Sequence, residues 1–282
     1  MAGSLPLVSL IVPFYGAEDT LARCAGSLFR QTYPQLEFFF VDDGSEDASA
    51  ALLKELILKE FPSLSPHVKI LSGAHEGPSL ARKKGIEAAS GKYLLMADAD
   101  DTLEPSAIAT LVEEAERREA DLVVFDFWKE YPRRQKLDRE KDSSIEHPDL
   151  FRRRLFTYRA YGYLWNKFLR RSLCEGLFFP KYPMQEDIVL SAQLIHKAGK
   201  IVHLKEPLYH YNRCNAKAAT RAPKAIRRSF AARNLMDFYR HFRDIPDSPL
   251  TGVEIIILRR AAWTALTLDR SLFTDYPELK KR

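Results

Sequence analysis

The sequence predicts an α/β protein with a largely parallel sheet. Short apolar runs alternate with helix-like segments through the first half of the 282-residue chain. Acidic turns follow two of these runs, and 46% of the residues are hydrophobic, which is enough to build a core. Strands joined by helices imply right-handed crossovers and a sheet that is covered on both faces. Ligands of such sheets bind at the carboxyl ends of the strands, so we expect the functional site there.

The predicted strands of the first half are short apolar runs that end at a turn or a proline. They cover residues 8–12, which Pro13 stops, 36–41, 68–71, 93–97 and 122–125. Between them, apolar residues recur at helical spacing. We therefore predict helices over residues 20–31, 48–61, 78–89 and 105–118.

The second half begins with a polar and charged stretch, 128–147, which we interpret as a variable loop or an excursion of the chain. An aromatic-rich stretch, 150–179, follows it. A helix is then predicted from about Gln185 to Lys197, with Gly199 as its stop.

The last third of the chain contains two short predicted strands, 200–204 and 208–211. Two helical patterns follow them, over residues 223–243 and 250–268. We expect these two helices to pack on the main domain.

Composition excludes several classes of protein. The net charge is +5, but the basic residues are scattered in short clusters without a nucleic-acid-binding module, so we expect no nucleic-acid partner. No stretch approaches the roughly 20 apolar residues of a membrane span, and we expect a globular cytoplasmic protein. Cys24, Cys174 and Cys214 match no zinc spacing and are expected to be reduced thiols.

Three carboxylates, Asp98, Asp100 and Asp101, follow the predicted strand 93–97. Such clustered anions repel one another unless a hard cation or a charge-rich ligand bridges them. Aspartates also begin helices frequently, so the triplet alone is a weak signal. At the end of a buried strand it predicts a Mg²⁺ or Mn²⁺ site for a nucleotide diphosphate.

The turn Asp42-Asp43-Gly44-Ser45 follows the second predicted strand. It has the composition of a strand-to-helix turn in which Ser45 caps the next helix. Alternatively, one carboxylate accepts a hydrogen bond from a planar donor such as the N3–H of uracil. The position at the sheet edge favours this second interpretation.

Glu186 and Asp187 open a predicted amphipathic helix, where the helix dipole favours acidic residues. A carboxylate at a helix terminus beside a pocket is also suited to take a proton from an attacking hydroxyl. His210 and Arg213 either belong to an edge strand or contact a leaving diphosphate, directly or through a metal.

The segment Trp165-Asn166-Lys167 leaves two alternatives open. Trp165 is either a core residue beside a lysine that reaches solvent, or part of a rim that stacks a sugar ring. In the second case, Trp165 and Lys167 contact the acceptor.

Several motifs in order resemble glycosyltransferase family 2 across residues 7 to 213. They are VSLIVPFYGAEDTLARCAGSLFRQTYP, VDDGSED, GPSLARKKGIEAASGKYLLMADADDTLEP, WNKFLRRSL, QEDI and LYHYNR. The resemblance implies a GT-A fold, a nucleotide-sugar donor, a divalent cation (Mn²⁺ or Mg²⁺) and inversion at the anomeric carbon. In relatives a basic residue commonly follows the LYHY run directly, whereas Asn212 precedes Arg213 here, and the segment 215–221 lacks the serine-rich character of their donor lid.

The same resemblance assigns expected roles to individual residues. Nucleotide contacts are implied for Pro13, Tyr15, Asp43, Arg82 and Asp98, with Asp43 on uracil. Asp100 is the implied principal metal ligand, His210 lies beside the metal and diphosphate, and Asp187 is the implied general base. Trp165, Lys167, Glu186 and Arg213 are expected to contact the acceptor or the diphosphate.

The expected organisation is a GT-A glycosyltransferase domain, 1–215, followed by a C-terminal helical extension, 216–282. The nucleotide-binding half would cover about 1–127 and the acceptor half about 128–215. We expect transfer from a UDP-sugar to a hydroxyl of a glycan or lipid-linked acceptor during surface polysaccharide synthesis. The C-terminal helices would serve peripheral contact with the inner membrane face or a homodimer.

Two other functions remain as alternatives. A sugar-phosphate nucleotidyltransferase normally has a Gly-rich basic loop after its first strand, and residues 13–18 read PFYGAE instead. A non-catalytic scaffold with a decayed site would be expected to lack Asp100 or Asp187, and both are present.

Overall fold

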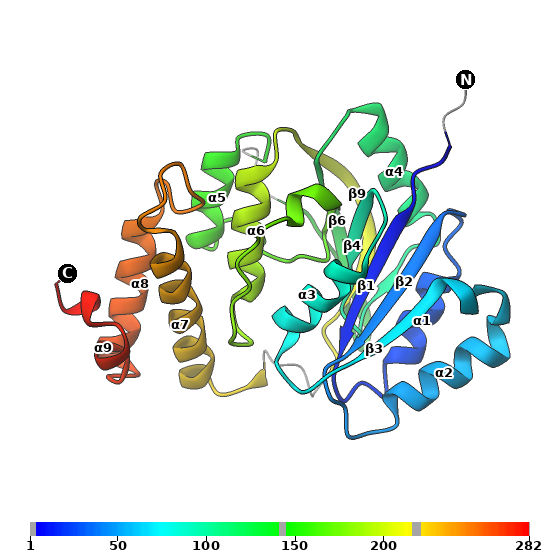
Figure 1. Ribbon diagram of the computed structural model, residues 1–282, viewed down its shortest axis with the longest axis horizontal. Helices are drawn as coiled ribbons and strands as arrows, with labels where there is room; N and C mark the ends of the chain where they lie inside the picture. Colours follow the sequence, from blue (N-terminus) through cyan, green and yellow to red (C-terminus); the bar gives the residue numbers. More distant parts are fainter. Residues whose placement is uncertain (1–3, 141–144, 216–220, 282) are drawn as a thin grey trace. The chain divides into compact units, whose positions relative to one another are not determined.

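The computed structural model describes residues 4–140, 145–215 and 221–281. The chain forms two compact units that alternate along the sequence (Figure 1). The sheet unit comprises Met1–Glu140, Leu164–Glu175 and Gly199–Asn215, and the helical unit comprises Lys141–Tyr163, Gly176–Ala198 and Ala216–Arg282.

The sheet unit is built on a nine-stranded mixed sheet in the described part of the chain, which confirms the α/β class. Its strand order is β3-β2-β1-β4-β8-β6-β9-β5, with β7 paired to β6. The strands β1 to β4 are mutually parallel, β8 is antiparallel to both β4 and β6, and β5 is antiparallel to β9. The bounds are β1 Val8–Phe14, β2 Leu36–Asp42, β3 Val68–Ser72, β4 Tyr93–Met96, β5 Thr102–Leu103, β6 Leu122–Tyr131, β7 Arg134–Asp138, β8 Lys167–Arg170 and β9 Ile201–Asn212.

Helices cover both faces of the parallel strands (Figure 1). Alternate side chains of a strand point to opposite faces. Phe29 of α1 packs edge-on against Phe38 of β2, whereas Gly85 of α3 approaches Ile11 and Val41 so closely that an added Cβ would lie 2.4 Å from Ile11 Cγ2. The helices of this unit are α1 Leu21–Phe29, α2 Ser49–Glu60, α3 Pro78–Ala88, α4 Ala107–Arg117 and the 3₁₀ turns η1 Pro62–His67 and η2 Arg171–Cys174.

The first strand does not stop at Pro13, as the sequence had predicted, but continues to Phe14. Ile11 directs its backbone groups toward β4, since its carbonyl accepts the N–H of Ala97 at 2.9 Å. The backbone groups of Pro13, two residues further on, point to the same side as those of Ile11. No residue of β4 lies opposite Pro13, because β4 ends at Met96. The missing N–H of Pro13 therefore costs no hydrogen bond of the sheet.

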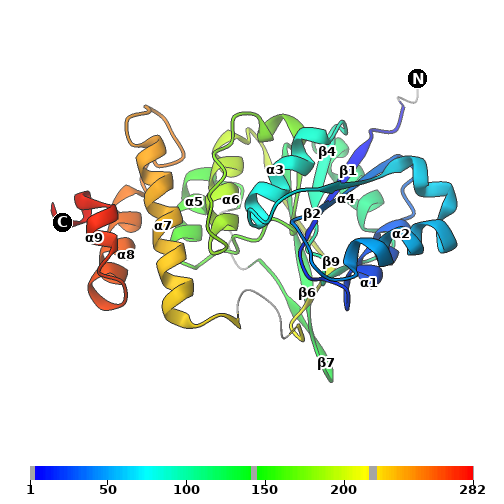
Figure 2. The same cartoon turned by 60° about the horizontal axis from the view of Figure 1, so that its bottom comes forward.

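Of the two interpretations of residues 128–147, the variable loop is wrong for the first part, where the chain forms strands. The strand β6 extends to Tyr131 and forms an antiparallel hairpin with β7 (Figure 2). The exposed ends of both strands are polar, so they lack the apolar alternation that identifies a strand from sequence. The two short strands predicted over 200–211 form one strand, β9, with an irregularity opposite Phe125 and Asp126.

The helical unit contains α5 Pro148–Phe156, α6 Glu186–Lys197, α7 Lys224–Phe242, α8 Glu254–Thr267, α9 Leu272–Asp275 and η4 Pro277–Lys281. Met236 of α7, Leu258 of α8 and Leu272 of α9 belong to one buried apolar cluster. Phe156 of α5 stacks on Phe238 of α7 with ring centroids 6.0 Å apart. No described helix has the length and apolar content needed to cross a membrane.

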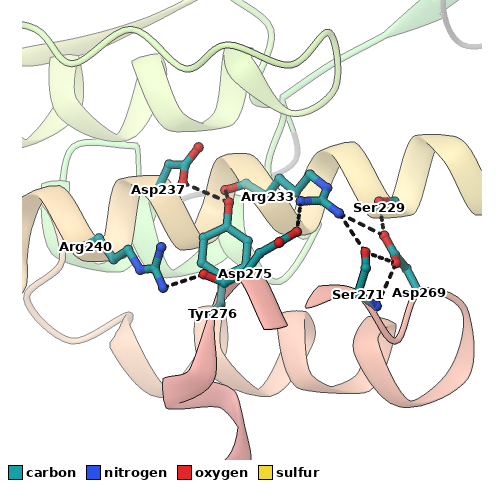
Figure 3. A network of polar contacts seen from close by, with 8 residues as sticks. All are labelled: Ser229, Arg233, Asp237, Arg240, Asp269, Ser271, Asp275 and Tyr276. Atoms are coloured by element: carbon teal, nitrogen blue, oxygen red, sulfur yellow. Dashed lines mark hydrogen bonds and ion pairs between the residues drawn. The ribbon is translucent and has the colours of Figure 1, made fainter. Parts of the chain in front are cut away.

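Polar contacts fasten the C-terminal turns to α7 (Figure 3). Arg233 pairs with Asp275 and with Asp269, and its Nη2 donates to Ser271 Oγ at 2.9 Å. Tyr276 donates its O–H to Asp237 Oδ1 at 2.8 Å. The arginines of this network therefore have carboxylate partners within the unit.

Candidate nucleotide and metal site

The turns after β1, β2 and β3 are joined at the carboxyl edge of the sheet. Gly16 N–H donates to Ser45 Oγ at 3.1 Å, and Gly73 N–H donates to the carbonyl of Asp42 at 3.1 Å. These bonds bring segments that are about 30 residues apart in sequence into one surface. This is the edge at which the parallel topology predicts a ligand.

Asp43 anchors the turn that follows β3. Its carboxylate accepts the backbone N–H groups of Glu76 and Gly77, both at 2.9 Å, and His75 Nδ1 lies 2.9 Å from Oδ2. The side chain is only 4% exposed. Asp43 is therefore a fixed acceptor that shapes the edge, and any base donor would share its remaining lone pairs.

An aromatic pair lies beside Asp43. Tyr15 is 51% exposed, and its ring centroid is 4.1 Å from that of His75, with an angle of 31° between the rings. Pro13, two residues before Tyr15, is buried. Sequence reasoning missed His75, although its place just beyond the third strand could have indicated it.

Arg82 holds the first aspartate of the acidic cluster. Its guanidinium is 4% exposed and donates from Nη2 to Asp98 Oδ1 at 2.9 Å. Arg82 reaches this position from α3, so the helix after β3 and the loop after β4 are joined by a charge-assisted hydrogen bond. The structure thus brings together two residues that the sequence had assigned separately to the nucleotide.

Asp101 lies beneath the cluster and is 1% exposed. Its carboxylate accepts the Tyr209 O–H at 2.8 Å and the backbone N–H of Asn212 at 2.7 Å. Burial, together with the charges of Asp100 and Asp98, raises the pKa of Asp101 well above its usual value. Asp101 therefore attaches the loop after β4 to β9. Nothing in the sequence indicated that Asp101 has this buried structural position while Asp98 and Asp100 are more exposed.

Asp100 is half-buried within the cluster. Its Oδ2 accepts Asn215 Nδ2 at 2.7 Å, and its backbone carbonyl accepts Arg23 Nη2 at 2.6 Å. Burial and the neighbouring charge of Asp98 raise the pKa of Asp100. Arg23 and Asn215 were not predicted, because their partners are 77 and 115 residues away in sequence.

The donor set fits a divalent cation that shares its coordination with a ligand. Asp98 and Asp100 offer hard carboxylate oxygens, each with one oxygen already in a hydrogen bond. Among the described residues, no group of three or more His, Cys, Asp or Glu side chains forms a complete metal cage. Mg²⁺ and Mn²⁺ commonly bind one or two carboxylates and complete their shell with water and substrate phosphates.

His210 uses both ring nitrogens. Nδ1 is 2.6 Å from Glu130 Oε1, and Nε2 is 2.9 Å from Glu104 Oε1. His210 could contact a metal or a diphosphate only if Glu104 or Glu130 moved away from the ring nitrogen that it contacts. Arg213 is exposed, and its Nη1 donates to the Tyr211 O–H oxygen at 3.1 Å.

Trp165 and Lys167 lie in the core. The Trp165 ring is 2% exposed and stacks on Tyr209, with centroids 4.4 Å apart. Lys167 is wholly buried and donates to Asn166 Oδ1 at 2.9 Å, so it does not reach solvent as the sequence had suggested. The structure supports the core alternative, and neither side chain presents a surface to an acceptor.

Glu186 and Asp187 belong to the helical unit, where they are the first two residues of α6 and half-buried. The preceding Gln185 has a left-handed backbone with φ of 62°. Its side chain is bonded to Tyr158 and accepts Arg260 Nη2 at 3.1 Å. The start of α6 is therefore fixed from within its own unit. The segment 216–220, which includes most of the expected lid, lies outside the described residues.

The parallel strands, the acidic loop after β4 and the edge formed by Asp43 define a GT-A glycosyltransferase fold. The chain belongs to glycosyl transferase family 2, whose family model matches residues 9–178. EpsH of Bacillus subtilis (strain 168) is 33% identical over 217 residues, which cover 73% of this chain and 60% of that relative. The chain thus matches less than two thirds of the length of EpsH.

Two solved structures share the fold. S. aureus TarS 1–349 in complex with UDP-GlcNAc superposes with a TM-score of 0.67 and 18% identity, covering 97% of this chain and 71% of that one. The mannosyltransferase PcManGT from Pyrobaculum calidifontis, in complex with GDP-Man and Mn²⁺, superposes with a TM-score of 0.61 and 16% identity, covering 97% and 75%. At these identities, the two structures show a shared fold.

Proposed function

We propose that this chain is an inverting, metal-dependent glycosyltransferase that transfers a hexosyl or N-acetylhexosaminyl group from a UDP-sugar. The acceptor is a hydroxyl of a glycan or of a lipid-linked saccharide in surface polysaccharide synthesis. One observation carries the proposal: the loop after β4 holds Asp98 and Asp100 at the carboxyl edge of the sheet, with Arg82 and Asn215 fixing their orientation.

The nucleobase of the donor would lie at the turn after β2. Asp43 accepts hydrogen bonds at a rigid edge, and the exposed ring of Tyr15 offers a stacking surface beside it. The UDP-GlcNAc complex of TarS supports uracil as the nucleobase. The GDP-Man complex of PcManGT is the reason to test GDP as well.

The diphosphate would lie over the acidic loop. Asp100 would be the principal metal ligand and Asp98 its neighbour, with Mn²⁺ in PcManGT as support. A bound Mn²⁺ or Mg²⁺ supplies positive charge against the negative charge that grows on the leaving diphosphate. His210 and Arg213 would contact the diphosphate from β9 and the residues that follow it.

Asp187 would act as the general base. The acceptor oxygen forms a bond to the anomeric carbon, the bond from that carbon to the diphosphate oxygen breaks, and the hydroxyl proton passes to Asp187. A single displacement inverts the configuration. We place the reaction in the cytoplasm at the inner membrane face, which the free thiols of Cys24, Cys174 and Cys214 support.

The test is a calorimetric titration of UDP, GDP, CDP and dTDP, each with and without Mn²⁺. We expect selective, Mn²⁺-dependent UDP binding that is lost in Asp100→Ala and kept in Glu87→Ala, an exposed carboxylate of the same unit. Nucleotide binding that survives Asp100→Ala would contradict the metal assignment. Absence of all nucleotide binding would indicate a non-catalytic scaffold, and release of pyrophosphate from a nucleoside triphosphate would indicate a nucleotidyltransferase.

A further inference from the structure

A pocket of about 300 Å³ lies wholly within the helical unit, between α7 and α8. Its polar lining consists of Arg228, Arg259 and Arg260, with Tyr158, Gln185 and Trp263 beside them. Alanine and leucine side chains of α7 complete the wall. The volume is at the lower end of the range of small-molecule sites, about 300–1,000 Å³.

The three guanidinium groups have no ion-pair partner in the part of the chain that the structure describes. Among the residues that the structure describes, no carboxylate lies within ion-pair distance of any of them. In α7, which also carries Arg228, Arg233 pairs with the carboxylate of Asp275 (Figure 3). Arg240 of the same helix pairs with the carboxylate of Glu278. Arg228 of the pocket therefore differs from Arg233 and Arg240 of the same helix, which have carboxylate partners.

Arg260 is half-buried, as is Arg228, and makes several hydrogen bonds. Its Nη1 donates to the carbonyl of Phe156 at 2.7 Å, and its Nη2 is bonded to the Tyr158 hydroxyl and to Gln185 Oε1. All of these acceptors are neutral. Burial lowers the pKa of Arg260 to about 10, as expected for a desolvated cation that lacks an anion.

The other two arginines are free to meet a ligand. Arg259 is exposed, and the guanidinium carbon of Arg228 lies 4.7 Å from the ring centroid of Trp263. The Trp263 side chain is 50% exposed, so it offers an apolar face next to the positive charge. One guanidinium group can donate two parallel hydrogen bonds to two oxygens of a phosphate, and an indole ring packs well against a sugar ring.

We propose that this pocket binds a phosphate group of the acceptor, with the adjoining sugar ring against Trp263. That the ligand is the acceptor rests on the proposed function. Gln185 lines the pocket and directly precedes Glu186 and Asp187, so the bound phosphate would lie within a few residues of the proposed base. The phosphate belongs to a phosphorylated glycan or to a lipid headgroup, and the experiment separates these sources.

The experiment uses the full chain with two soluble probes, glucose 1-phosphate and neutral glucose, in calorimetry. Flotation with phosphatidylglycerol or phosphatidylcholine vesicles tests the lipid source. Arg228→Ala and Arg259→Ala remove pocket charges, while Arg270→Ala removes an exposed arginine of the same unit outside the pocket. We expect glucose 1-phosphate to bind and each pocket variant to weaken binding about tenfold or more, since a hydrogen bond to a charged group is lost.

Loss of vesicle binding in the pocket variants, without soluble binding, would equally support phosphate recognition and assign it to a lipid. The proposal would be overturned if the protein bound neither glucose 1-phosphate nor the vesicles, or if Arg270→Ala weakened binding as much as the pocket variants do. UDP with Mn²⁺ is titrated in parallel and should bind all four proteins alike. If UDP binds but both phosphate arms fail, the pocket assignment alone is wrong; if UDP fails and glucose 1-phosphate binds, the donor assignment is wrong.

Discussion

Tyr209 joins the last long strand of the sheet to the acidic loop. Its O–H donates to Asp101 Oδ2 at 2.8 Å, and its oxygen accepts the backbone N–H of Asp98 at 3.0 Å. The ring is fully buried against Trp165. The orientation of the proposed metal ligands therefore depends on a side chain more than 100 residues away in sequence.

Tyr209→Phe should destabilise the protein and weaken Mn²⁺-dependent UDP binding. The substitution leaves a buried carboxylate oxygen and a backbone N–H without these partners, which typically costs about 1–3 kcal/mol of unfolding free energy. Urea denaturation measures this loss. Tyr15→Phe is the control, because the exposed Tyr15 ring packs on His75. Equal stability of both variants would show that the buried bonds contribute nothing.

Gly44→Ala should be more destabilising than Gly16→Ala. Both glycines have positive φ, 81° and 58°, so both substitutions strain the backbone by about 1–3 kcal/mol. Only at Gly44 would the new Cβ also meet backbone atoms, at 3.0 Å from His75 N and 3.2 Å from the Gly73 carbonyl oxygen. Thermal denaturation of the two variants compares their total costs, and identical melting temperatures would contradict an added steric cost at Gly44.

Glu37 should make stability depend on pH in the acid range. Burial raises its pKa, but hydrogen bonds from Ser9, Ser90 and Gly91 outweigh burial and lower it overall. A lowered folded-state pKa contributes stability above the unfolded value of about 4.3, and this contribution disappears as pH falls through the folded value.

Glu37→Gln should therefore lose stability at pH 7 and show a smaller decline between pH 5 and 3 than the wild type. Denaturant titrations at several pH values measure this difference. Glu87→Gln, at an exposed glutamate, should retain the wild-type slope. A steep decline that is unchanged in Glu37→Gln would assign the acid sensitivity to other carboxylates.

Asp187→Asn should abolish transfer without abolishing donor binding. Removal of a general base typically lowers kcat by about 10²–10⁴-fold, while UDP affinity should stay within about twofold because the nucleotide contacts lie elsewhere. Single-turnover sugar transfer and UDP calorimetry separate the two effects. Asp244→Asn changes an exposed carboxylate of the same unit and should be neutral. Unchanged kcat in Asp187→Asn would exclude it as the base.

The sequence predicted the parallel half of the sheet well, because β1, β2 and β4 are buried apolar runs with clear turns after them. The same reasoning located Asp43 and Asp98 just beyond the carboxyl ends of β2 and β4. It missed β7, whose residues are polar, and β8, which is only four residues long.

The supporting residues of the site were also missed. Arg23, His75, Tyr209 and Asn215 act through contacts between distant segments, such as the Asn215 bond to Asp100 across 115 residues. Local periodicity carries no signal for such pairs. Trp165 has a composition suited to a sugar platform, and only its packing on Tyr209 identifies it as a core residue.

The alternation of the two units along the chain restricts how acceptor specificity can be engineered. Asn234 of α7 accepts the N–H of Tyr182 at 3.0 Å and donates to the carbonyls of Tyr182 and Met184. The peptide groups just before α6 therefore depend on α7 for their hydrogen-bond partners. A deletion after residue 215 would leave these peptide groups without α7 and would expose the apolar side of α5 and α6. The proposed base and the proposed phosphate pocket both belong to the helical unit. A chimera intended to borrow a relative's acceptor preference would therefore exchange residues 145–163, 176–198 and 221–281 together.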